Sequence, residues 1–554
     1  MSYYQKHRET LERAIKALHQ RTFFAQYPEF PSPKIYGETA DADGRDKFQN
    51  ILGKKFEELQ QDGAAAWIGE EASPYLQEPL NIQYPQFDTG ILISQASAAF
   101  SSWRKVAPTE RAGILVESLE RLKVRFFEIA YGTMHTTGQG YMMAFQASGP
   151  HAADRALEAI ACGLEEQQRF PGAARWEKPM GKYQIDLQKE WRIVPKGISL
   201  VIGCSTFPTW NSVPGIYASL VTGNPVIVKP HPGAILPIAI FVAEIQKVLK
   251  DAGLDPNTCQ LAVDTFDDQC TLALAEHPEV KLIDFTGNSE FGSYLEKLPG
   301  KMVFTEKTGV NSVIIDSVTD IDKVAQNLAF SVSLYSGQMC TAPQNIFIPE
   351  SGIKMGNETI SLAQFAEKLS DSINSLMDNP KAGPFVLGAI QNQKTCDRIT
   401  QAEKLPGKVW LASRSIENPM FKNARIATPV VLQVNQDQKE VYSKELFGPI
   451  ALLISTKDID EAIALAREQA EKNGAISCGA YTTNDEIKER IADQMSMAAT
   501  PVSFNLTGGI YLNQHAGFSD FHVTGGNPAG NASFTNPEFV VKRFVLVGIR
   551  EEVG

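Results

Sequence analysis

Two side chains in the middle of the chain could supply a nucleophile and a base. Cys340 stands in GQMCTAPQN, where small and polar neighbours would let a thiol face a cleft. Glu306 ends an apolar run in VFTEKTGVNSVII and is followed by loop residues. A thiolate attacks electrophilic carbon, and a carboxylate in a partly dry cleft accepts protons. Taken singly, a lone cysteine is more often a core residue and a strand-end glutamate more often a solvated charge.

Two other motifs are suited to binding a nucleotide. Lys229 ends the apolar run in VIVKP, on the ligand side of an expected parallel strand. FTGNSEFG, which contains Thr286, Gly287 and Asn288, turns from a strand into a helix whose first amides suit a pyrophosphate. Each of these motifs is weak evidence by itself.

Alternating strands and helices must position these motifs. The strand-like runs NPVIVKP, CQLAVDTF and VKLIDFTG alternate with helical runs at 236–252, before His277 and at 290–297. This alternation indicates a parallel sheet covered by helices. A second α/β region runs from about 303 to 500, with strands such as NSVIID, QNIFIP and PIALLIS. Parallel sheets bind ligands at the carboxyl ends of their strands, where the motifs stand.

The two ends of the chain depart from this pattern. Residues 1–93 have helical stretches near 9–21 and 48–61, separated by Pro- and Gly-containing segments. Their many aromatic residues favour an arm wrapped on the protein over a solvated linker. The alternation in KYQIDLQKEWRIVPKG predicts a hairpin near 181–196, and PEFVVKRFVLVGI predicts a terminal strand.

The composition excludes several classes of protein. A chain of 554 residues is long enough for two or three domains. The net charge of −12 provides no basic field for nucleic acid or anionic membranes. Seven cysteines without a CxxC pair predict neither a disulfide framework nor a metal cluster. Without a signal-peptide pattern or a run of about 18 apolar residues, a cytoplasmic protein is expected.

The order of the motifs is more informative than any one of them. The separation of Glu306 and Cys340, 340 − 306 = 34 positions, and the sequence of motifs resemble the signature set of the aldehyde dehydrogenase superfamily. The resemblance covers about 94–544. The matching positions, in chain order, are Lys229, Phe285-Thr286-Gly287, Glu306, Cys340 and Glu445-x-Phe447.

This resemblance implies an α/β fold with a Rossmann-type cofactor domain, an α/β catalytic domain and a small β bridging element for oligomerisation. The implied boundaries are 1–93 for an N-terminal arm packed on the cofactor domain and 94–305 for the NAD(P)-binding domain, whose hairpin belongs to the bridging element. The catalytic domain would be 306–500, and the C-terminal bridging segment 501–554. A homodimer or a homotetramer would follow.

The resemblance also implies a reaction. Cys340 would attack an aldehyde carbonyl, the thiohemiacetal would give a hydride to NAD or NADP, and Glu306 would activate water to hydrolyse the thioester. Hydrolysis through Glu306 favours release of a free acid over transfer to coenzyme A.

Other matching residues have positioning roles in the resembling family. Lys229 would hydrogen-bond the cofactor ribose, and Gly287 with Asn288 would lie at the turn that passes the cofactor. Glu445 and Phe447, two residues apart in KELFGPI and so pointing the same way, would hold the nicotinamide ribose and pack beside the nicotinamide.

Three departures from the family pattern matter. Thr206, in CSTFP, replaces the usual asparagine that donates to the oxyanion. The oxyanion would then rely on the Cys340 backbone amide with Thr206, on a nearby asparagine such as Asn211, or on a weaker arrangement. Pro232 replaces a glutamate that would repel a 2′-phosphate, which favours NADP over NAD. The glycine-rich turn expected near AVDTFDD is missing, and Lys307-Thr308 replace the usual Leu-Gly.

The N-terminal arm and the segment FHVTGGNPAGNASF resemble the phenylacetate-degradation (PaaN) branch of the superfamily. That branch implies a coenzyme A-linked semialdehyde as substrate. Two alternatives stay open on the sequence: a coenzyme A-acylating reductase on the same fold, and a catalytically weakened homologue that acts in binding or assembly.

Overall fold

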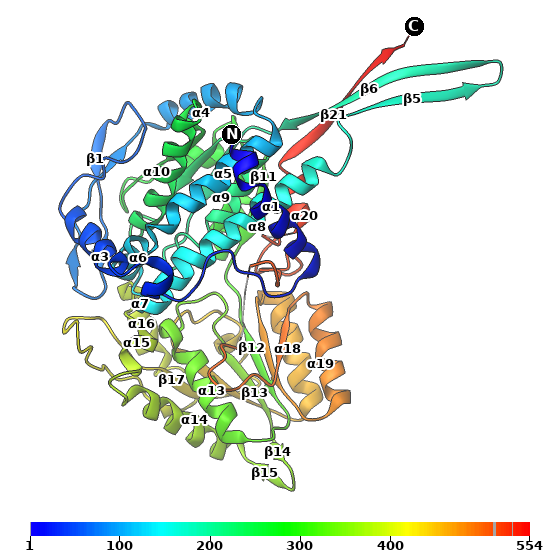
Figure 1. The fold of residues 1–554 in the computed structure, drawn as a ribbon. Helices are drawn as coiled ribbons and strands as arrows, with labels where there is room; N and C mark the ends of the chain where they lie inside the picture. Colours follow the sequence, from blue (N-terminus) through cyan, green and yellow to red (C-terminus); the bar gives the residue numbers. More distant parts are fainter. Residues whose placement is uncertain (1, 513–516, 535, 554) are drawn as a thin grey trace.

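The structure, a computed structural model, describes residues 2–512, 517–534 and 536–553. Figure 1 shows two α/β lobes, with a long β-ribbon projecting from the lobe that contains the first half of the chain. Among the described residues, no helix has the length and apolar character needed to cross a membrane.

The first lobe is built on a parallel sheet of five strands in the order β11-β10-β7-β8-β9. The chain adds strands outward on one side of β7 and then returns to the other side, which confirms the predicted Rossmann-type topology. The burial of every residue in β7, β8 and β9 agrees with a sheet covered on both faces. The strands are β7 (Ile198–Ile202), β8 (Val226–Lys229), β9 (Cys259–Leu261), β10 (Val280–Thr286) and β11 (Met302–Glu306).

Helices pack around this sheet, and apolar side chains from both form a large core. The helices that precede or connect its strands are α4 (Thr89–Trp103), α5 (Pro108–Lys123), α6 (Phe126–Thr137), α7 (Tyr141–Gln146), the π-helix η1 (Ala147–His151), α8 (Ala152–Gln168), α9 (Val213–Val221), α10 (Leu236–Asp251), η2 (Pro256–Thr258), α11 (Thr271–Glu276) and α12 (Ser289–Leu295).

The second lobe is built on a sheet of seven strands in the order β16-β17-β18-β13-β12-β19-β20. All its neighbours are parallel except the edge pair β16 and β17. The strands are β12 (Ser312–Ile315), β13 (Asn345–Pro349), β16 (Lys408–Leu411), β17 (Val430–Asn435), β18 (Ile450–Thr456), β19 (Cys478–Tyr481) and β20 (Val502–Phe504), and a small hairpin is formed by β14 (Ile353–Met355) and β15 (Glu358–Ile360).

Helices cover both faces of the second sheet, over two apolar clusters. They are α13 (Ile321–Ser333), η3 (Leu334–Gly337), α14 (Leu362–Met377), α15 (Gly383–Leu387), α16 (Gln393–Ala402), α17 (Lys439–Tyr442), α18 (Ile459–Asn473) and α19 (Asp485–Met497).

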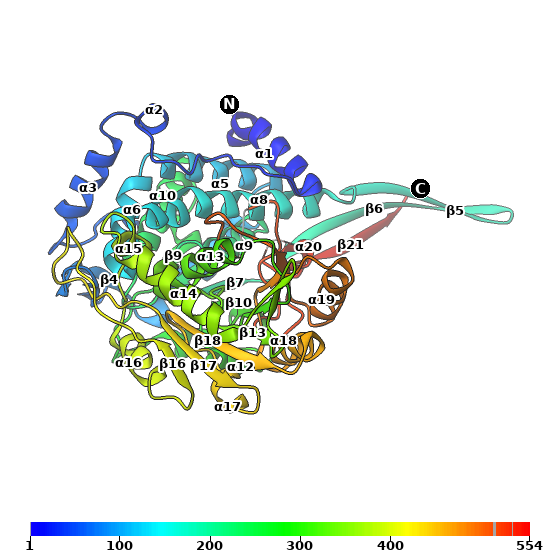
Figure 2. The same ribbon diagram turned by 90° about the horizontal axis from the view of Figure 1, so that it is seen from below.

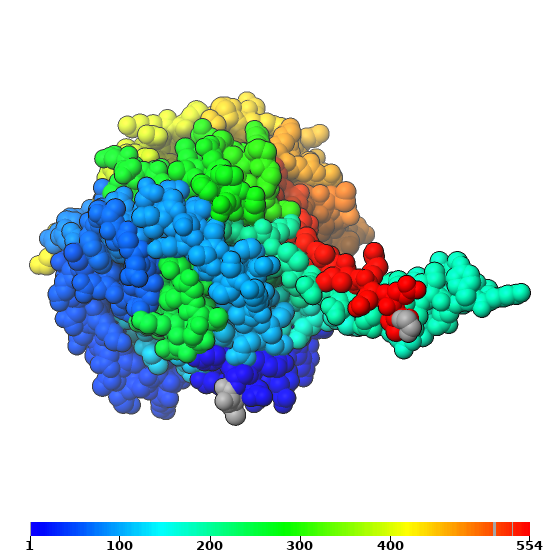
Figure 3. Space-filling view, turned by 90° about the horizontal axis from the view of Figure 1, so that it is seen from above, coloured from blue at the N-terminus to red at the C-terminus, as the bar shows by residue number. Residues whose placement is uncertain are grey.

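The projecting ribbon is an antiparallel sheet of β5 (Ala173–Met180), β6 (Tyr183–Pro195) and β21 (Phe544–Glu552), in the order β21-β6-β5. In Figure 3 the red end of the chain lies along the cyan hairpin outside the globular body. The alternation near 181–196 is therefore one long strand and not a whole hairpin, because its first partner strand lies upstream.

The end of the chain corrects a second prediction. PEFVV, expected to begin the terminal strand, forms the short helix α20 (Pro537–Val541). Asn536 caps it by accepting from the amide of Phe539, and proline is favoured in the first helical turn. The terminal strand begins only at Phe544.

The N-terminal arm packs on the helices of the first lobe. In Figure 2, α1 lies across the layer that contains α5 and α8. The predicted helix near 48–61 is wrong in position, because α3 ends at Ile51 and the following residues are extended or turned. The elements of the arm are α1 (Tyr3–Gln20), α2 (Pro33–Tyr36), α3 (Ala40–Ile51), β1 (Ala66–Ile68), β2 (Ala72–Ser73), β3 (Glu78–Pro79) and β4 (Tyr84–Gln86).

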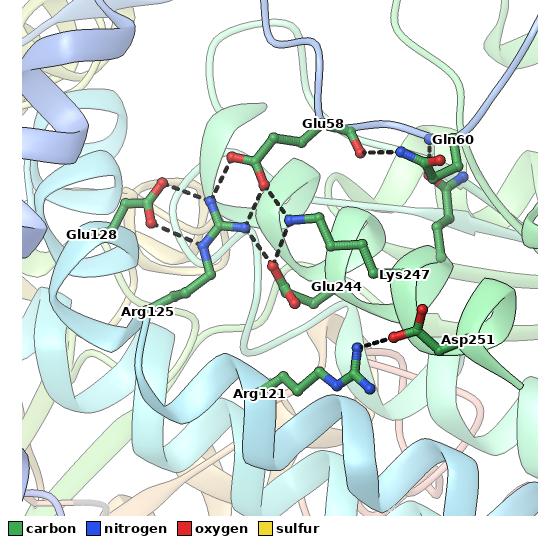
Figure 4. A network of polar contacts seen from close by, with 9 residues as sticks. Glu58, Gln60, Arg121, Arg125, Glu128, Glu244, Lys247 and Asp251 are labelled. Atoms are coloured by element: carbon green, nitrogen blue, oxygen red, sulfur yellow. Dashed lines mark hydrogen bonds and ion pairs between the residues drawn. The ribbon is translucent and has the colours of Figure 1, made fainter.

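An ionic network fixes the arm to two helices of the first lobe (Figure 4). Arg125, at the start of α6, contacts Glu58 of the arm at 2.8 Å, and Glu128 and Glu244 at 2.7 Å each. Lys247 adds a second cation between Glu58 and Glu244. The arginine and two of its partners are buried, so removal of one charge would leave an uncompensated buried charge, which is costly.

A second contact of the arm lies at the N-terminus of α10. The buried Glu71 accepts from the amides of Ile235 and Leu236 at 2.5 and 2.9 Å and from the hydroxyl of Tyr84 at 2.6 Å. A carboxylate is stabilised at a helix N-terminus by free amides and by the helix dipole. The arm is thus part of the packed structure of the first lobe.

Candidate active site

The sequence-predicted residues gather at the carboxyl ends of the first sheet. Lys229 ends β8, Thr286 ends β10 and Glu306 ends β11, and the last two are register neighbours. The strand order reverses between β7 and β10, and α/β sheets bind ligands beside such a reversal.

Glu306 is held by two side-chain donors. Asn211 Nδ2 donates to its Oε2 at 2.8 Å, and His522 Nε2 lies 3.1 Å from its Oε1. The side chains of Glu306 and His522 are each only 1% exposed. The backbone is fixed as well, because Glu306 forms a β-bridge with Gly530 and Lys307 donates its amide to Ala529 at 2.6 Å.

Cys340 lies in a tight loop after η3. Gly337 has a φ of +61°, and a Cβ there would come within 2.2 Å of the carbonyl oxygen of Gly448. Asn311 donates to the carbonyls of Cys340 and Ala342 at 2.8 and 3.0 Å. The loop is therefore clamped from both sides.

The two lobes bring Cys340 next to Glu306. One ligand-type atom from each of Cys340, Glu306 and His522 lies within 4.8 Å of the others. Burial and the adjacent Glu306 hold the pKa of the Cys340 thiol well above its usual value. Burial works to raise the pKa of Glu306, but His522 and Arg155 outweigh it and lower that pKa below the usual value. At rest the pair is a neutral thiol beside a carboxylate.

A cavity of about 180 Å³ opens onto Cys340, Asn211 and His522. Most of its wall is apolar or aromatic. These wall residues are Met143, Phe207, Trp210, Leu334, Met339 and Tyr511.

Of the two oxyanion-donor candidates, Asn211 lines this cavity and Thr206 does not. The Thr206 carbonyl accepts from Gln139 at 2.8 Å, and its side chain interacts with the thiol of Cys204, whose pKa burial raises to about 11. An amide nitrogen has two hydrogens, so Asn211 can donate to Glu306 and to a substrate oxygen. The geometry thus favours Asn211.

Lys229 meets a carboxylate that sequence reasoning missed. Its Nζ lies 2.7 Å from Asp264 Oδ1, and both side chains are almost fully buried. Asp264 Oδ1 has no geometrically sound hydrogen bond among the described residues. Burial raises the pKa of Asp264 against the opposing effect of Lys229. Asp264 belongs to AVDTFDD, where the glycine-rich turn of the family was expected.

Glu445, in the second lobe, lies near enough to Cys340 for its charge to act on the thiol. It interacts with the amide of Gly309, and burial raises its pKa to about 7. The carbonyl of its neighbour Phe447 accepts from Arg398 Nη1 at 2.5 Å, which anchors this segment.

The turn after β10 is closely packed at Gly287, and the side chain of Asn288 is already hydrogen-bonded. A Cβ at Gly287 would meet the Phe285 ring at 2.6 Å, so only glycine fits there. Asn288 caps α12 by accepting from the amide of Phe291 at 2.8 Å. Lys307 pairs with Glu296 at 2.9 Å, away from Cys340.

Comparison with known proteins agrees with this geometry. The family model described as "Aldehyde dehydrogenase family" matches residues 83–536. The chain belongs to the aldehyde dehydrogenase family. A solved structure of an NAD-dependent aldehyde dehydrogenase from Burkholderia multivorans is 45% identical, with a TM-score of 0.97 and 100% coverage of both chains.

More distant relatives are, by name, dehydrogenases of 1-pyrroline-5-carboxylate and of a semialdehyde. 1-Pyrroline-5-carboxylate dehydrogenase 1 of Halalkalibacterium halodurans is 26% identical over 387 residues, 68% of this chain and 70% of its own. N-Succinylglutamate 5-semialdehyde dehydrogenase of Chromobacterium violaceum is 27% identical over 418 residues, 74% of this chain and 77% of its own. The superfamily expected from the sequence is confirmed.

Sequence reasoning missed three charged or polar residues that the fold brings to the site: Asp264, His522 and Arg155. Asp264 stands beyond a strand end, where a ligand residue could have been sought. His522 lies in FHVTGG, which carries no recognisable chemistry, about 200 positions from Glu306. Arg155 lies within a helix whose residues are almost all buried.

Proposed function

We propose that this protein oxidises an aldehyde to a carboxylic acid with a nicotinamide coenzyme, using Cys340 as nucleophile and Glu306 as general base. The observation that supports it most is the meeting of these two side chains, one from each lobe, where Cys340 lines a cavity. Family membership supports the reaction class.

In the first half-reaction, Glu306 accepts the proton as the sulfur of Cys340 bonds to the aldehyde carbon. The carbonyl oxygen gains negative charge, and Asn211 is placed to donate to it. Bound nicotinamide supplies the hydride acceptor for the thiohemiacetal. The clamp at Asn311 keeps the sulfur in one place while the carbon changes geometry.

Glu306 then releases the first proton to solvent. In the second half-reaction it takes a proton from water, whose oxygen attacks the thioester carbon and displaces the sulfur of Cys340 as a thiolate, and that thiolate regains a proton from Glu306. A lowered pKa keeps Glu306 ionised and able to accept that proton at neutral pH. This route releases a free acid. It makes the coenzyme A-acylating alternative less favoured, because acyl transfer to coenzyme A needs no base that activates water.

The residues present fit a nicotinamide coenzyme. Lys229 and Asp264 would hold ribose hydroxyls, the turn at Gly287 and Asn288 would lie beside the coenzyme, and Glu445 would hold the second ribose. Pro232 by itself favoured NADP. Asp264, however, places a carboxylate beside Lys229, where it would repel a 2′-phosphate, and we infer a preference for NAD.

The apolar cavity wall supports an aldehyde with an uncharged, apolar or aromatic segment next to the carbonyl. Our specific substrate proposal remains a coenzyme A-linked semialdehyde from phenylacetate breakdown. In such a compound a carbon chain carries the aldehyde group. The named relatives are instead dehydrogenases of 1-pyrroline-5-carboxylate and of N-succinylglutamate 5-semialdehyde.

The test is a spectrophotometric assay of NAD and NADP reduction with a panel of aliphatic, aromatic and carboxylate-bearing aldehydes, with and without coenzyme A. We expect NAD reduction with apolar aldehydes, no requirement for coenzyme A and a free acid as product. Absence of reduction with every aldehyde, together with no coenzyme binding by calorimetry, would favour the non-catalytic homologue. An obligatory need for coenzyme A would contradict hydrolysis through Glu306.

A further inference from the structure

We propose that His522 is a positioning residue for the general base: its Nε2–H bond orients the Glu306 carboxylate and keeps it ionised for thioester hydrolysis. This inference rests on the proposed role of Glu306. It assigns a function to a segment, FHVTGG, that the reaction otherwise leaves unused.

The contact is direct and enclosed. His522 Nε2 lies 3.1 Å from Glu306 Oε1, while Asn211 donates to Oε2 at 2.8 Å. The two donors fix both oxygens, so the carboxylate cannot rotate without losing a bond. Since both side chains are 1% exposed, water cannot easily replace a lost donor, and an unpaired buried oxygen is costly.

The same C-terminal segment also holds the backbone at this point. Gly530 forms a β-bridge with Glu306, and the carbonyl of His522 accepts from the amide of Phe534 at 3.0 Å. A single loop therefore fixes the main chain of Glu306 and aims a side chain at its carboxylate.

The imidazole ring is itself held in place by aromatic and cationic neighbours. Its centroid lies 4.8 Å from that of Trp210, edge to face at 83°. The guanidinium of Arg155 lies 3.8 Å from the centroid of the Trp210 ring, and its Nε and Nη2 have no hydrogen-bond partner among the described residues. Arg155 thus keeps a buried positive charge behind the indole.

Several charged and titratable groups surround the His522 ring. Glu306 faces it directly, Cys340 lies within 4.8 Å, Arg155 lies behind Trp210, and His151 lines the same cavity. The contact with His522, the hydrogen bond from Cys340 and the charge of Arg155 lower the pKa of Glu306 against the effect of burial. Without His522, less would counteract the effect of burial, and the pKa of Glu306 would rise.

Two substitutions separate the bond from mere space filling. In His522→Gln the amide nitrogen can reach about the position of Nε2, whereas in His522→Asn it falls short. Both are polar and smaller than histidine, so their effects on packing are similar. His7→Asn is the control. His7, in α1 of the arm, is also buried, and its Nε2 lies 2.7 Å from a carboxylate oxygen of Glu117 in α5.

The measurement is the pH dependence of deacylation, with no coenzyme or aldehyde present. Cys340 is acetylated with p-nitrophenyl acetate, the adduct is located by mass spectrometry, and its loss is followed in stopped samples from pH 5 to 9. Thermal midpoints confirm folding. Because no hydride is transferred, a result here stands apart from success or failure of the aldehyde assay.

We expect His522→Asn to deacylate about 10²-fold more slowly at pH 7, with its acid limb moved to higher pH. The deacylation rate of His522→Gln should stay within about tenfold of the wild-type rate. His7→Asn should deacylate at the wild-type rate. Equal rates and limbs in wild type and His522→Asn would overturn the proposal. Equal loss in the Asn and Gln variants would also overturn it, because the imidazole itself would then be required.

Wild type provides a check that needs no variant. With His522 in place, deacylation should stay nearly constant from pH 8 down to 5, because the pKa of Glu306 lies below its usual 4.5. A fall in rate that is already half complete near pH 6 would contradict the proposed role.

Discussion

At the scale of single residues, Cys340 and Glu306 differ in proton affinity in a way that shapes the reaction. The thiol keeps its proton at rest because its pKa is raised, and Glu306 stays ionised because its pKa is lowered. Thiols react and oxidise as thiolates. The thiol is therefore unreactive until the substrate brings an electrophilic carbon to the sulfur.

The oxyanion donor can be identified by a matched pair of variants. Asn211→Ala should lower kcat by about 10²- to 10³-fold, since it removes a donor at the reacting oxygen and one at Glu306. Thr206→Val, which keeps the shape, should lower kcat by less than about tenfold. Steady-state kinetics decide between them, and the opposite ranking would restore Thr206 to the role that the sequence predicts.

Coenzyme affinity should depend on pH through Glu445. Its pKa is raised to about 7, so it is protonated below that pH and ionised above it. If the carboxylate accepts ribose hydroxyls, the Kd for NAD should rise about tenfold between pH 8 and pH 6. Calorimetry measures this, and Glu445→Gln should remove the slope. An unchanged slope in that variant would assign the titration to another group.

The residues that sequence could identify are those whose spacing is fixed along the chain. Glu306 and Lys229 each end a strand, and Cys340 follows in the order of the family motifs, so local pattern and order are enough to find them. Asp264 stands beyond a strand end, but its pairing with Lys229 shows only in the fold, and no local pattern marks the contact of His522 with Glu306. Their roles depend on the fold of the whole chain.

At the scale of elements, the loop that carries Cys340 depends on a left-handed glycine. Gly337→Ala should destabilise the protein by more than about 1 kcal/mol, through backbone strain, and reduce kcat by displacing the loop. Gly356→Ala is the control, because Gly356 has a φ of +58° but open space around its Cβ position. Gly356→Ala should therefore lose stability through backbone strain and keep the wild-type kcat. Equal kcat in both variants would mean that contact with Gly448 does not place Cys340.

Element prediction succeeded where periodicity was unambiguous and failed where ends and partners decide the structure. The buried strands of the first sheet were visible as apolar runs. The strand near 181–196 looked like a hairpin because alternation along a single strand does not show where its partner lies. The segment 48–61 looked helical, yet the helix ends at Ile51, and PEFVV became helix α20 through its Asn-Pro start.

At the scale of the whole molecule, the projecting ribbon leaves β21 as an edge strand with apolar side chains exposed on both faces. Unpaired edges and exposed apolar strands are suited to association. We propose that this ribbon joins protomers into a dimer or tetramer. The exposed residues include Val545, Leu546, Val547 and Ile549.

The proposed assembly can be tested by light scattering after gel filtration. Val545→Glu/Val547→Glu places two charges on one face of β21 and should yield monomers. Val409→Glu, at another exposed valine on edge strand β16, should not. A monomeric wild type, or a double variant that keeps the wild-type mass, would contradict a role for the ribbon.

The most direct test of the central claim is to trap the acyl-enzyme in a single turnover. Glu306→Gln is mixed with an aldehyde that wild type oxidises and with the coenzyme, quenched in acid and analysed by peptide mass spectrometry. The account predicts that one equivalent of reduced coenzyme forms more slowly than in wild type, because the variant lacks the base that takes the thiol proton. A stable thioester should then remain on the peptide that contains Cys340, with no adduct in Glu306→Gln/Cys340→Ala. Rapid multiple turnover by Glu306→Gln, or an adduct on any other residue, would contradict it.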